Sequence, residues 1–163
     1  MPNGKALVLG SFALLAASSG CVTPGKVWLY PDGSPGPEEC PDEAKKAMRY
    51  MDVHVGDRSA LYIDANQSEN EFTVLHGGPI ESILLEGFGP LRGASRLYGQ
   101  VWIGGPQVVI RYYAAQAPSG EKVPFCAVAR FGGDQMKKLP DSKPGSAKLL
   151  GSTAYAYVVD AFR

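Results

Sequence analysis

The chain has 163 residues, with 16 Lys and Arg against 16 Asp and Glu, so its formal net charge is zero. This length suffices for one domain with a hydrophobic core and is short for two. The sequence contains no block of like charge. Nucleic-acid-binding domains usually carry a strong basic excess or a basic stripe, so we expect no nucleic-acid partner.

Residues 1–20 have the composition of a secretory signal peptide. Lys5 is their one charged residue, and an apolar run over residues 6–17 is followed by three small residues, 18–20. The run is too short to cross a bilayer, which takes about 20 apolar residues. A basic start, a short apolar run and a small-residue exit predict a segment that is cleaved from the mature protein.

Cys21 follows these small residues directly, in the stretch LAASSGC. This stretch resembles the lipobox of bacterial lipoprotein precursors, in which the cysteine sulfur receives a diacylglyceryl group and the cysteine becomes the first residue. Ser18 stands where leucine is commoner, and Val22 stands where many lipoproteins retained at the inner membrane have aspartate. The resemblance implies an acylated, palmitate-carrying Cys21 and a membrane anchor in the cell envelope, in the outer membrane facing the periplasm or the cell surface. The alternatives are an ordinary cleaved signal, with Cys21 free or disulfide-bonded, and an uncleaved anchor.

Cys40 and Cys126 form the remaining pair of cysteines. Because disulfides persist in an oxidising compartment such as the periplasm, we predict a bond between them. Such a bond, closing a loop of about 87 residues, would stabilise the fold by up to about 4.5 kcal/mol in the chain-entropy model. The sequence lacks a C-x-x-C pair and its two histidines are separated from the cysteines, which argues against a metal site. A reactive thiol is the other alternative.

Residues 21–39 combine the expected anchor with a Pro/Gly-rich tether. Residues 22–39 contain four prolines and three glycines, and we expect them to extend about 20–25 Å as a coil with little structure of their own. Residues 26–30 alternatively add an edge strand to the domain, or Trp28 and Tyr30 lie at the membrane interface. The folded domain is expected to cover residues 40–163.

One amphipathic helix is predicted over residues 40–51. Pro41 suits a first helical position, and Asp42 and Glu43 complement the positive end of the helix dipole. Apolar residues follow three-to-four spacing along one face, at Ala44, Ala47, Met48 and Met51. We expect this face to pack on a sheet, with Cys40 joining the helix start to the strand that holds Cys126.

Seven later segments are rich in β-branched and aromatic residues and are bounded by turn-forming residues. They are residues 59–65, 72–76, 81–88, 95–104, 107–117, 122–131 and 152–162. This pattern predicts a mainly β fold, a single β-sandwich or small β-barrel of about seven strands with one short N-terminal α-helix. Residues 118–120 (PSG) predict a hairpin turn, and residues 131–148 predict a long surface loop.

Residues 76–79 (HGGP) resemble the glycine-rich oxyanion loop of lipase-like hydrolases. That site also needs a G-x-S-x-G elbow, which the sequence lacks, so a turn between two strands is the favoured interpretation. His54 lies between two valines and is interpreted as non-catalytic. The sequence has no phosphate-cradling or dinucleotide-binding motif, and we expect no cofactor.

Two longer resemblances cover the domain. Residues 91–102 and 108–125 are similar to the β-barrel of outer-membrane-core subunits of type IV secretion systems. The combination of CPDEAKKAM, GPIES, RLYGQVW, KVPFC and SKPG resembles small uncharacterised lipoproteins of myxobacteria. The second resemblance implies a lipid anchor and a two-cysteine domain, and it implies no assigned activity.

Aromatic residues concentrate in residues 95–113. Tyrosine, tryptophan and arginine dominate binding hot spots, so Tyr98, Trp102, Tyr112 and Tyr113 are candidate binding residues. Core packing and cross-strand pairing are the alternative for all four. We therefore expect a membrane-anchored envelope lipoprotein with a non-enzymatic binding or structural β domain, whose partner is an envelope protein or polysaccharide. The alternative is a small envelope hydrolase that uses His76 or His54.

Overall fold

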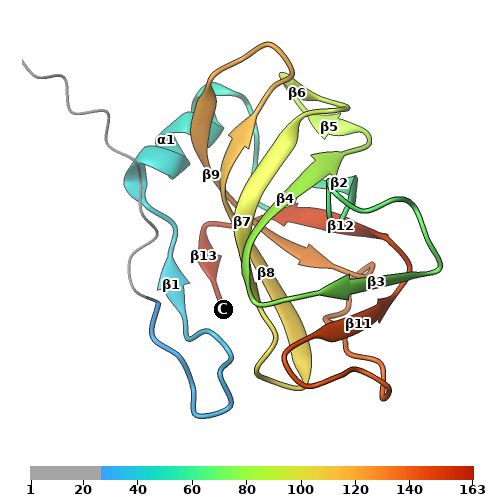
Figure 1. Cartoon of the computed structure of the whole chain (residues 1–163). Helices are drawn as coiled ribbons and strands as arrows, with labels where there is room; N and C mark the ends of the chain where they lie inside the picture. Colours follow the sequence, from blue (N-terminus) through green and yellow to red (C-terminus); the bar gives the residue numbers. More distant parts are fainter. Residues whose placement is uncertain (1–26) are drawn as a thin grey trace, which may run out of the picture.

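The computed structural model describes residues 27–163 (Figure 1). The expected signal peptide and Cys21 lie outside the described residues. The elements in chain order are β1 (Glu38–Glu39), α1 (Asp42–Tyr50), β2 (Arg58–Tyr62), β3 (Phe72–Leu75), β4 (Gly78–Leu84), β5 (Gly87–Phe88), β6 (Leu91–Arg92), β7 (Arg96–Trp102), β8 (Gln107–Gln116), β9 (Lys122–Arg130), β10 (Met136–Lys137), β11 (Ala147–Leu150), β12 (Thr153–Val158) and β13 (Ala161–Phe162).

Six antiparallel strands close into a small barrel in the order β8-β7-β4-β2-β12-β9, and β9 pairs back with β8. β10 adds a short seventh strand beside the start of β8. Closure pairs the long strands on both sides and so removes exposed sheet edges. The mainly β prediction with one helix is confirmed, in its barrel form, and each of the seven predicted segments overlaps a strand longer than three residues, whereas β11, an eighth such strand, lies outside them.

Apolar residues that face the core alternate with residues that face outward along the strands, and this alternation explains why the sequence forms a barrel. In β12, Ala154, Ala156 and Val158 are buried, while the residues between them are exposed or half-buried. A side chain at Gly99 would collide with the backbone carbonyl of Arg111 on the neighbouring strand. The register of β7 against β8 shifts at this glycine, so the irregularity depends on a residue that has no Cβ atom.

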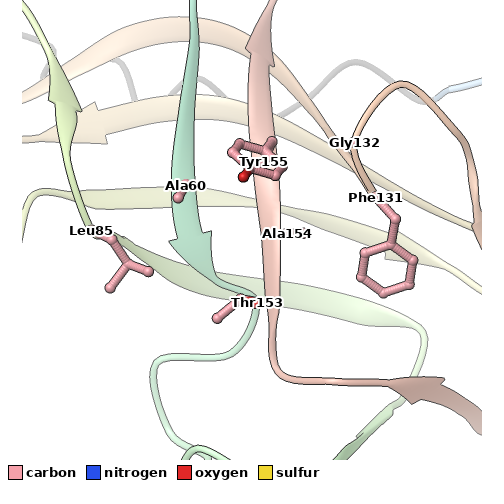
Figure 2. Close-up of a pocket in the computed structure, with 7 residues that line it drawn as sticks. All are labelled: Ala60, Leu85, Phe131, Gly132, Thr153, Ala154 and Tyr155. Atoms are coloured by element: carbon pink, nitrogen blue, oxygen red, sulfur yellow. The ribbon is translucent and has the colours of Figure 1, made fainter.

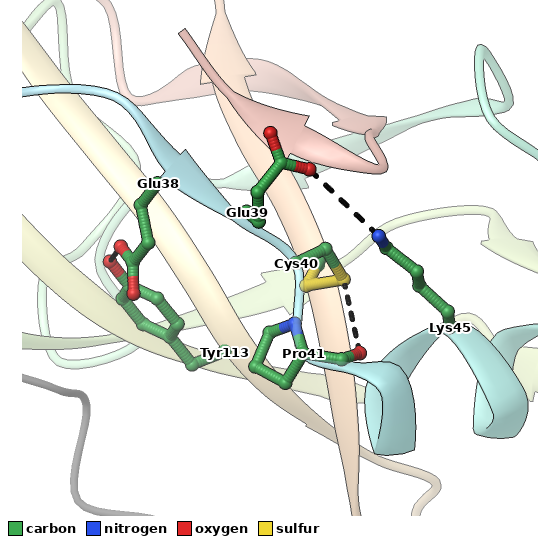
Figure 3. The surroundings of a disulfide bond; sticks show 7 residues. Glu38, Glu39, Cys40, Pro41, Lys45 and Tyr113 are labelled. Atoms are coloured by element: carbon green, nitrogen blue, oxygen red, sulfur yellow. Dashed lines mark hydrogen bonds and ion pairs between the residues drawn. A yellow bond between two sulfur atoms is a disulfide. The ribbon is translucent and has the colours of Figure 1, made fainter.

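The predicted helix forms over Asp42–Tyr50 and lies against β9 (Figure 1). Ala44 and Met48 are its buried residues. The predicted disulfide between Cys40 and Cys126 is also confirmed, and it joins the chain just before α1 to the middle of β9 (Figure 3). The PSG turn joins β8 to β9 as predicted.

The N-terminal segment differs from the expected tether. Residues 27–39, called the strap below, lie against the barrel, and β1 pairs with β13 at Glu38 and Phe162. Residues 27–30 form no strand, and Leu29 makes a single bridge with Pro35. The strap is ordered because its backbone finds partners elsewhere in the chain, which its proline and glycine content did not indicate.

The expected loop over residues 131–148 also contains more structure than predicted. It includes β10 and the start of β11, and β11 pairs with β3 from Ala147 and Leu75 to Leu150 and Phe72. In both β3 and β11, buried residues alternate with exposed or half-buried ones, so together the two strands cover part of the core.

Candidate functional site

The outer face of β2, β12 and β9 carries a cluster of tyrosines and arginines. The pairing register places Tyr155 between Ala60 and Arg130, and Tyr157 between Arg58 and Val128. Because residues directly opposite in a sheet share a face, Arg58, Ala60, Arg130, Tyr155 and Tyr157 all point outward. We call these five residues the open face.

Cation–π contacts order the open face. The Cζ atom of Arg58 lies 5.6 Å from the ring centroid of Tyr155, and the Cζ atom of Arg130 lies 5.9 Å from that of Tyr157. The pKa of Arg58 is raised above its ordinary value, first by a hydrogen bond with the Tyr157 side chain. Arg58 therefore stays charged, and Tyr155 keeps 38% of its surface exposed.

A pocket of about 220 Å³ adjoins this cluster (Figure 2). Its lining residues are Ala60, Leu85, Phe131, Gly132, Thr153, Ala154 and Tyr155. Leu85 is 40% exposed, so apolar surface borders the aromatic and cationic side chains. Such a surface can receive an apolar side chain in the pocket while the arginines and tyrosine hydroxyls make polar contacts around it.

The sequence did not single out Tyr155 and Tyr157. A signal was present in TAYAYV, where alanine alternates with tyrosine over residues 153–158. Buried alanines at alternate positions place the tyrosines on the outer face. The density of aromatic residues drew attention to β7 and β8 instead.

The four aromatic residues proposed from the sequence have different environments. Tyr112 has no exposed surface, and its hydroxyl lies 2.7 Å from that of Ser82. It therefore cannot contact a partner in this structure, and it has the core role that was the alternative interpretation. Tyr98 is half-buried, its hydroxyl donates to Gln116 at 2.7 Å, and the Lys122 Nζ atom lies 3.5 Å from its ring centroid.

Trp102 and Tyr113 belong to a cluster that the strap covers. Its centre is Arg111, which is 2% exposed and donates to the carbonyl oxygens of Gly36 at 2.8 Å and Pro35 at 3.4 Å. The Arg111 Cζ atom also lies 5.5 Å from the ring centroid of Trp102. These contacts give both aromatic residues a role within the protein's own chain, and their role in binding stays a prediction.

Glu38 supplies the negative charge of this cluster. Its Oε2 atom lies 3.5 Å from Nη1 of Arg111 and accepts a hydrogen bond of 2.8 Å from the Tyr113 hydroxyl (Figure 3). Burial, followed by the neighbouring Glu38, raises the pKa of Tyr113 above its ordinary value. Tyr113 therefore remains protonated and keeps donating to the carboxylate at neutral pH.

The two histidines lie apart from these clusters. His54 is exposed, with its ring 3.5 Å from a carboxylate oxygen of Asp52 and 3.9 Å from one of Asp57. The Nδ1 atom of His76 lies 3.1 Å from the carbonyl oxygen of Gly145, in the predicted turn between β3 and β4. Within residues 27–163, no serine, threonine or cysteine side chain hydrogen-bonds to either imidazole ring, so no nucleophile–base pair is formed there.

A second pocket of about 470 Å³ lies beside the loop before β11. It is lined by Ile103, Gly104, Lys138, Ser142, Lys143, Pro144, Gly145 and Ser146. The Nζ atom of Lys138 already donates to the carbonyl oxygen of Ile103 at 2.5 Å.

In the part of the chain that the structure describes, no group of three or more His, Cys, Asp or Glu side chains is arranged to hold a metal ion. From residue 27 onward, no helix is long and apolar enough to span a membrane.

Comparison with protein-family models finds no match, and comparison with curated proteins finds none either. The case for a function therefore depends on the sequence and on the geometry of this chain.

Proposed function

We propose that this protein is a lipid-anchored lipoprotein of the cell envelope, and that its barrel binds another envelope protein through the open face. The observation that carries the binding proposal is the arrangement of two tyrosines and two arginines on one outer face, next to a pocket that Tyr155 lines together with Leu85 and Phe131. These residue types dominate the hot spots of protein interfaces. An apolar pocket favours a protein partner because it suits an apolar side chain better than a sugar ring.

The disulfide supports the envelope location. Cys40 and Cys126 are bonded to each other, which is typical of proteins in oxidising compartments. Cys21 is the third cysteine of the chain, and it follows an apolar run and three small residues. A role as lipid attachment site explains that position, and two or more acyl chains would hold the protein stably at a membrane.

Mass spectrometry of the natively expressed protein tests the anchor. We expect a mature chain that begins at an acylated Cys21, and we expect Cys21→Ser to abolish incorporation of a palmitate analogue. Thr23→Ala is the matched control, because it lies close by but outside the resemblance, and it should leave incorporation unchanged. An unmodified Cys21, or an intact segment 1–20, would refute the anchor.

Affinity purification from detergent-solubilised envelope tests the open face. The double variant Tyr155→Ala/Tyr157→Ala should lose the partner protein, by a factor of about 10 or more if either tyrosine is a hot spot. Tyr50→Ala is the control, because Tyr50 is 93% exposed on α1 and lies outside the open face. Equal recovery by the double variant and the control would contradict the proposal. Retention of the wild type on insoluble cell-wall polysaccharide, with no protein recovered, would replace the protein partner with a polysaccharide.

No described observation favours a hydrolase. His54 and His76 come from different parts of the fold, each with its own polar contacts, and neither lines the two pockets described above. We therefore propose a binding role without catalysis.

A further inference from the structure

We infer that Trp28, Leu29 and Tyr30 form a membrane-docking surface, which rests the barrel on the bilayer in a fixed orientation. The inference depends on the proposed lipid anchor at Cys21 and goes beyond it, because an anchor alone leaves the domain free to rotate on its linker. The occupant of the surface is the interfacial layer of the membrane.

Trp28, Leu29 and Tyr30 are consecutive in the chain and all exposed, and we call them the patch. Trp28 is 61% exposed, Leu29 47% and Tyr30 44%. The ring centroids of Trp28 and Tyr30 lie 4.5 Å apart in an edge-to-face arrangement. Single exposed apolar side chains are normal, whereas a run of three with two aromatic rings indicates a binding surface. Tryptophan and tyrosine are the residues enriched at membrane–water interfaces.

A tight hairpin holds the patch in shape. The Tyr30 amide donates to the carbonyl of Ser34 at 2.8 Å, and the Gly36 amide donates to the carbonyl of Trp28 at 2.7 Å. A side chain at Gly36 would collide with the Trp28 ring, so the indole lies directly over the glycine. Because the backbone is already ordered, docking would cost little further conformational entropy.

The hairpin is also fixed to the barrel. Arg111 binds the Pro35 and Gly36 carbonyls, and the disulfide at Cys40 attaches the chain to β9 shortly afterwards. At the turn of the hairpin, a side chain at Gly33 would lie 3.2 Å from the Cα atom of Gly104. The patch therefore has one position relative to the domain, and its contact with a surface would orient the whole barrel.

The length of the preceding chain places the patch at the membrane. Five residues, 22–26, separate Cys21 from Val27. Even fully extended, the chain from Cys21 to Val27 spans at most about 22 Å, and as a coil it averages about 14 Å. An acylated Cys21 lies at the bilayer surface, so a rigid aromatic patch that begins one residue after Val27 is held within reach of the headgroups.

Two single-tryptophan variants of the lipidated, full mature protein test the inference. The chain has two tryptophans, so Trp102→Phe leaves Trp28 as the reporter. The control carries Trp28→Phe, Trp102→Phe and Tyr50→Trp, so that its single tryptophan lies on α1, where Tyr50 is 93% exposed. Each variant is placed in phosphatidylethanolamine–phosphatidylglycerol vesicles with or without brominated acyl chains. We expect brominated lipid to quench Trp28 emission and to shift the remaining emission to the blue, and we expect the emission of the tryptophan at position 50 to change little.

Mass spectrometry of the same samples separates the two proposals. Acylated Cys21 with unquenched Trp28 would overturn the docking surface and leave the anchor standing. Trp28 that is shielded from an aqueous quencher but untouched by brominated lipid would mean that a protein or a second copy covers the patch, which also overturns the inference. An unmodified Cys21 would overturn the anchor and the docking surface together. Equal quenching of the tryptophans at positions 28 and 50 would show that the barrel has no fixed orientation.

Discussion

The outside of the barrel carries two clusters in which an arginine lies against aromatic rings. The two clusters contain the same types of side chain and differ in whether a segment of the chain covers them. Arg111 on β8 lies 5.1 Å from the Phe162 ring centroid and is buried under the strap, whereas Arg58 on β2 lies 5.6 Å from the Tyr155 ring centroid and is exposed. Around the closed barrel, β8 and β2 are on opposite sides, three positions apart in the ring order. On the Arg111 side this chain supplies the covering segment itself, so a segment of a partner protein is the corresponding cover for the cluster at Arg58 in our proposal.

Removing the disulfide should have the largest effect, on the covered side. The double variant Cys40→Ala/Cys126→Ala loses a link across 86 residues, and we expect a loss of about 4 kcal/mol in the free energy of unfolding, because the unfolded chain regains loop entropy. Urea denaturation with and without reductant measures it. If reduction left the midpoint of the wild type unchanged, the strap would be held by the Arg111 contacts alone.

Arg111→Met should have the next largest effect. It removes the buried cation and leaves the Gly36 and Pro35 carbonyls and Glu38 without that donor, which we expect to lower the free energy of unfolding by about 3 kcal/mol. Arg58→Met is the matched variant on the open face, and it should leave the urea midpoint unchanged. Similar losses in the two variants would remove the distinction between the faces.

Tyr112→Phe should cost about 1 kcal/mol, because it removes one buried hydrogen bond. Ser82 donates its hydroxyl proton to the carbonyl of Ile63, so Tyr112 is the donor in the bond between the two hydroxyls. The matched variant Tyr155→Phe, on the open face, should have no measurable effect on stability.

The Tyr112→Phe variant also tests how the free energy of unfolding depends on pH. Burial raises the pKa of Tyr112 well above its ordinary value of 10. The unfolded chain therefore releases this proton at lower pH than the folded chain does. The stabilisation that Tyr112 contributes is fully present below pH 10 and is lost as the pH rises above 10. We expect a decline of up to about 1.4 kcal/mol per pH unit from this residue. Tyr112→Phe should flatten the decline measured by urea unfolding between pH 9 and 11.5; an unchanged slope would contradict it.

Tyr155→Ala should change the free energy of unfolding by no more than about 0.5 kcal/mol, because it is a surface substitution outside the core. Thermal unfolding monitored by circular dichroism checks it. A large loss would mean that Tyr155 supports the barrel, and a binding defect of the double variant could then reflect instability.

Much of the fold could be predicted from local pattern. The alternation in TAYAYV, the apolar spacing around Met48 and the turn at residues 118–120 are short-range signals, and the structure contains the strand, helix and hairpin that they predict. The Cys40–Cys126 bond followed from the number of cysteines and the expected compartment, without knowledge of the topology.

The strap and the open face depend on contacts that local pattern does not contain. Arg111 lies 75 residues from Gly36, and the proline and glycine content of the strap indicates only that no regular element forms there. In β8, the alternation of a strand did not reveal which of Arg111, Tyr112 and Tyr113 faces the core, because the register against β9 shifts between Tyr112 and Ala114. The density of aromatic residues therefore selected one core residue, two residues of the covered cluster and the half-buried Tyr98. Tyr155, which is exposed, and Tyr157, which is half-buried, lie in a strand with no unusual sequence feature.

Site-specific photo-crosslinking in intact cells tests the contrast between the faces most directly. A photoreactive phenylalanine analogue replaces Tyr155 on the open face or Tyr113 under the strap in the full-length protein, and adducts are resolved by denaturing electrophoresis. We predict a discrete adduct with another envelope protein from position 155 and none from position 113. An adduct from position 113 with none from position 155 would contradict the assignment of the open face as the binding surface.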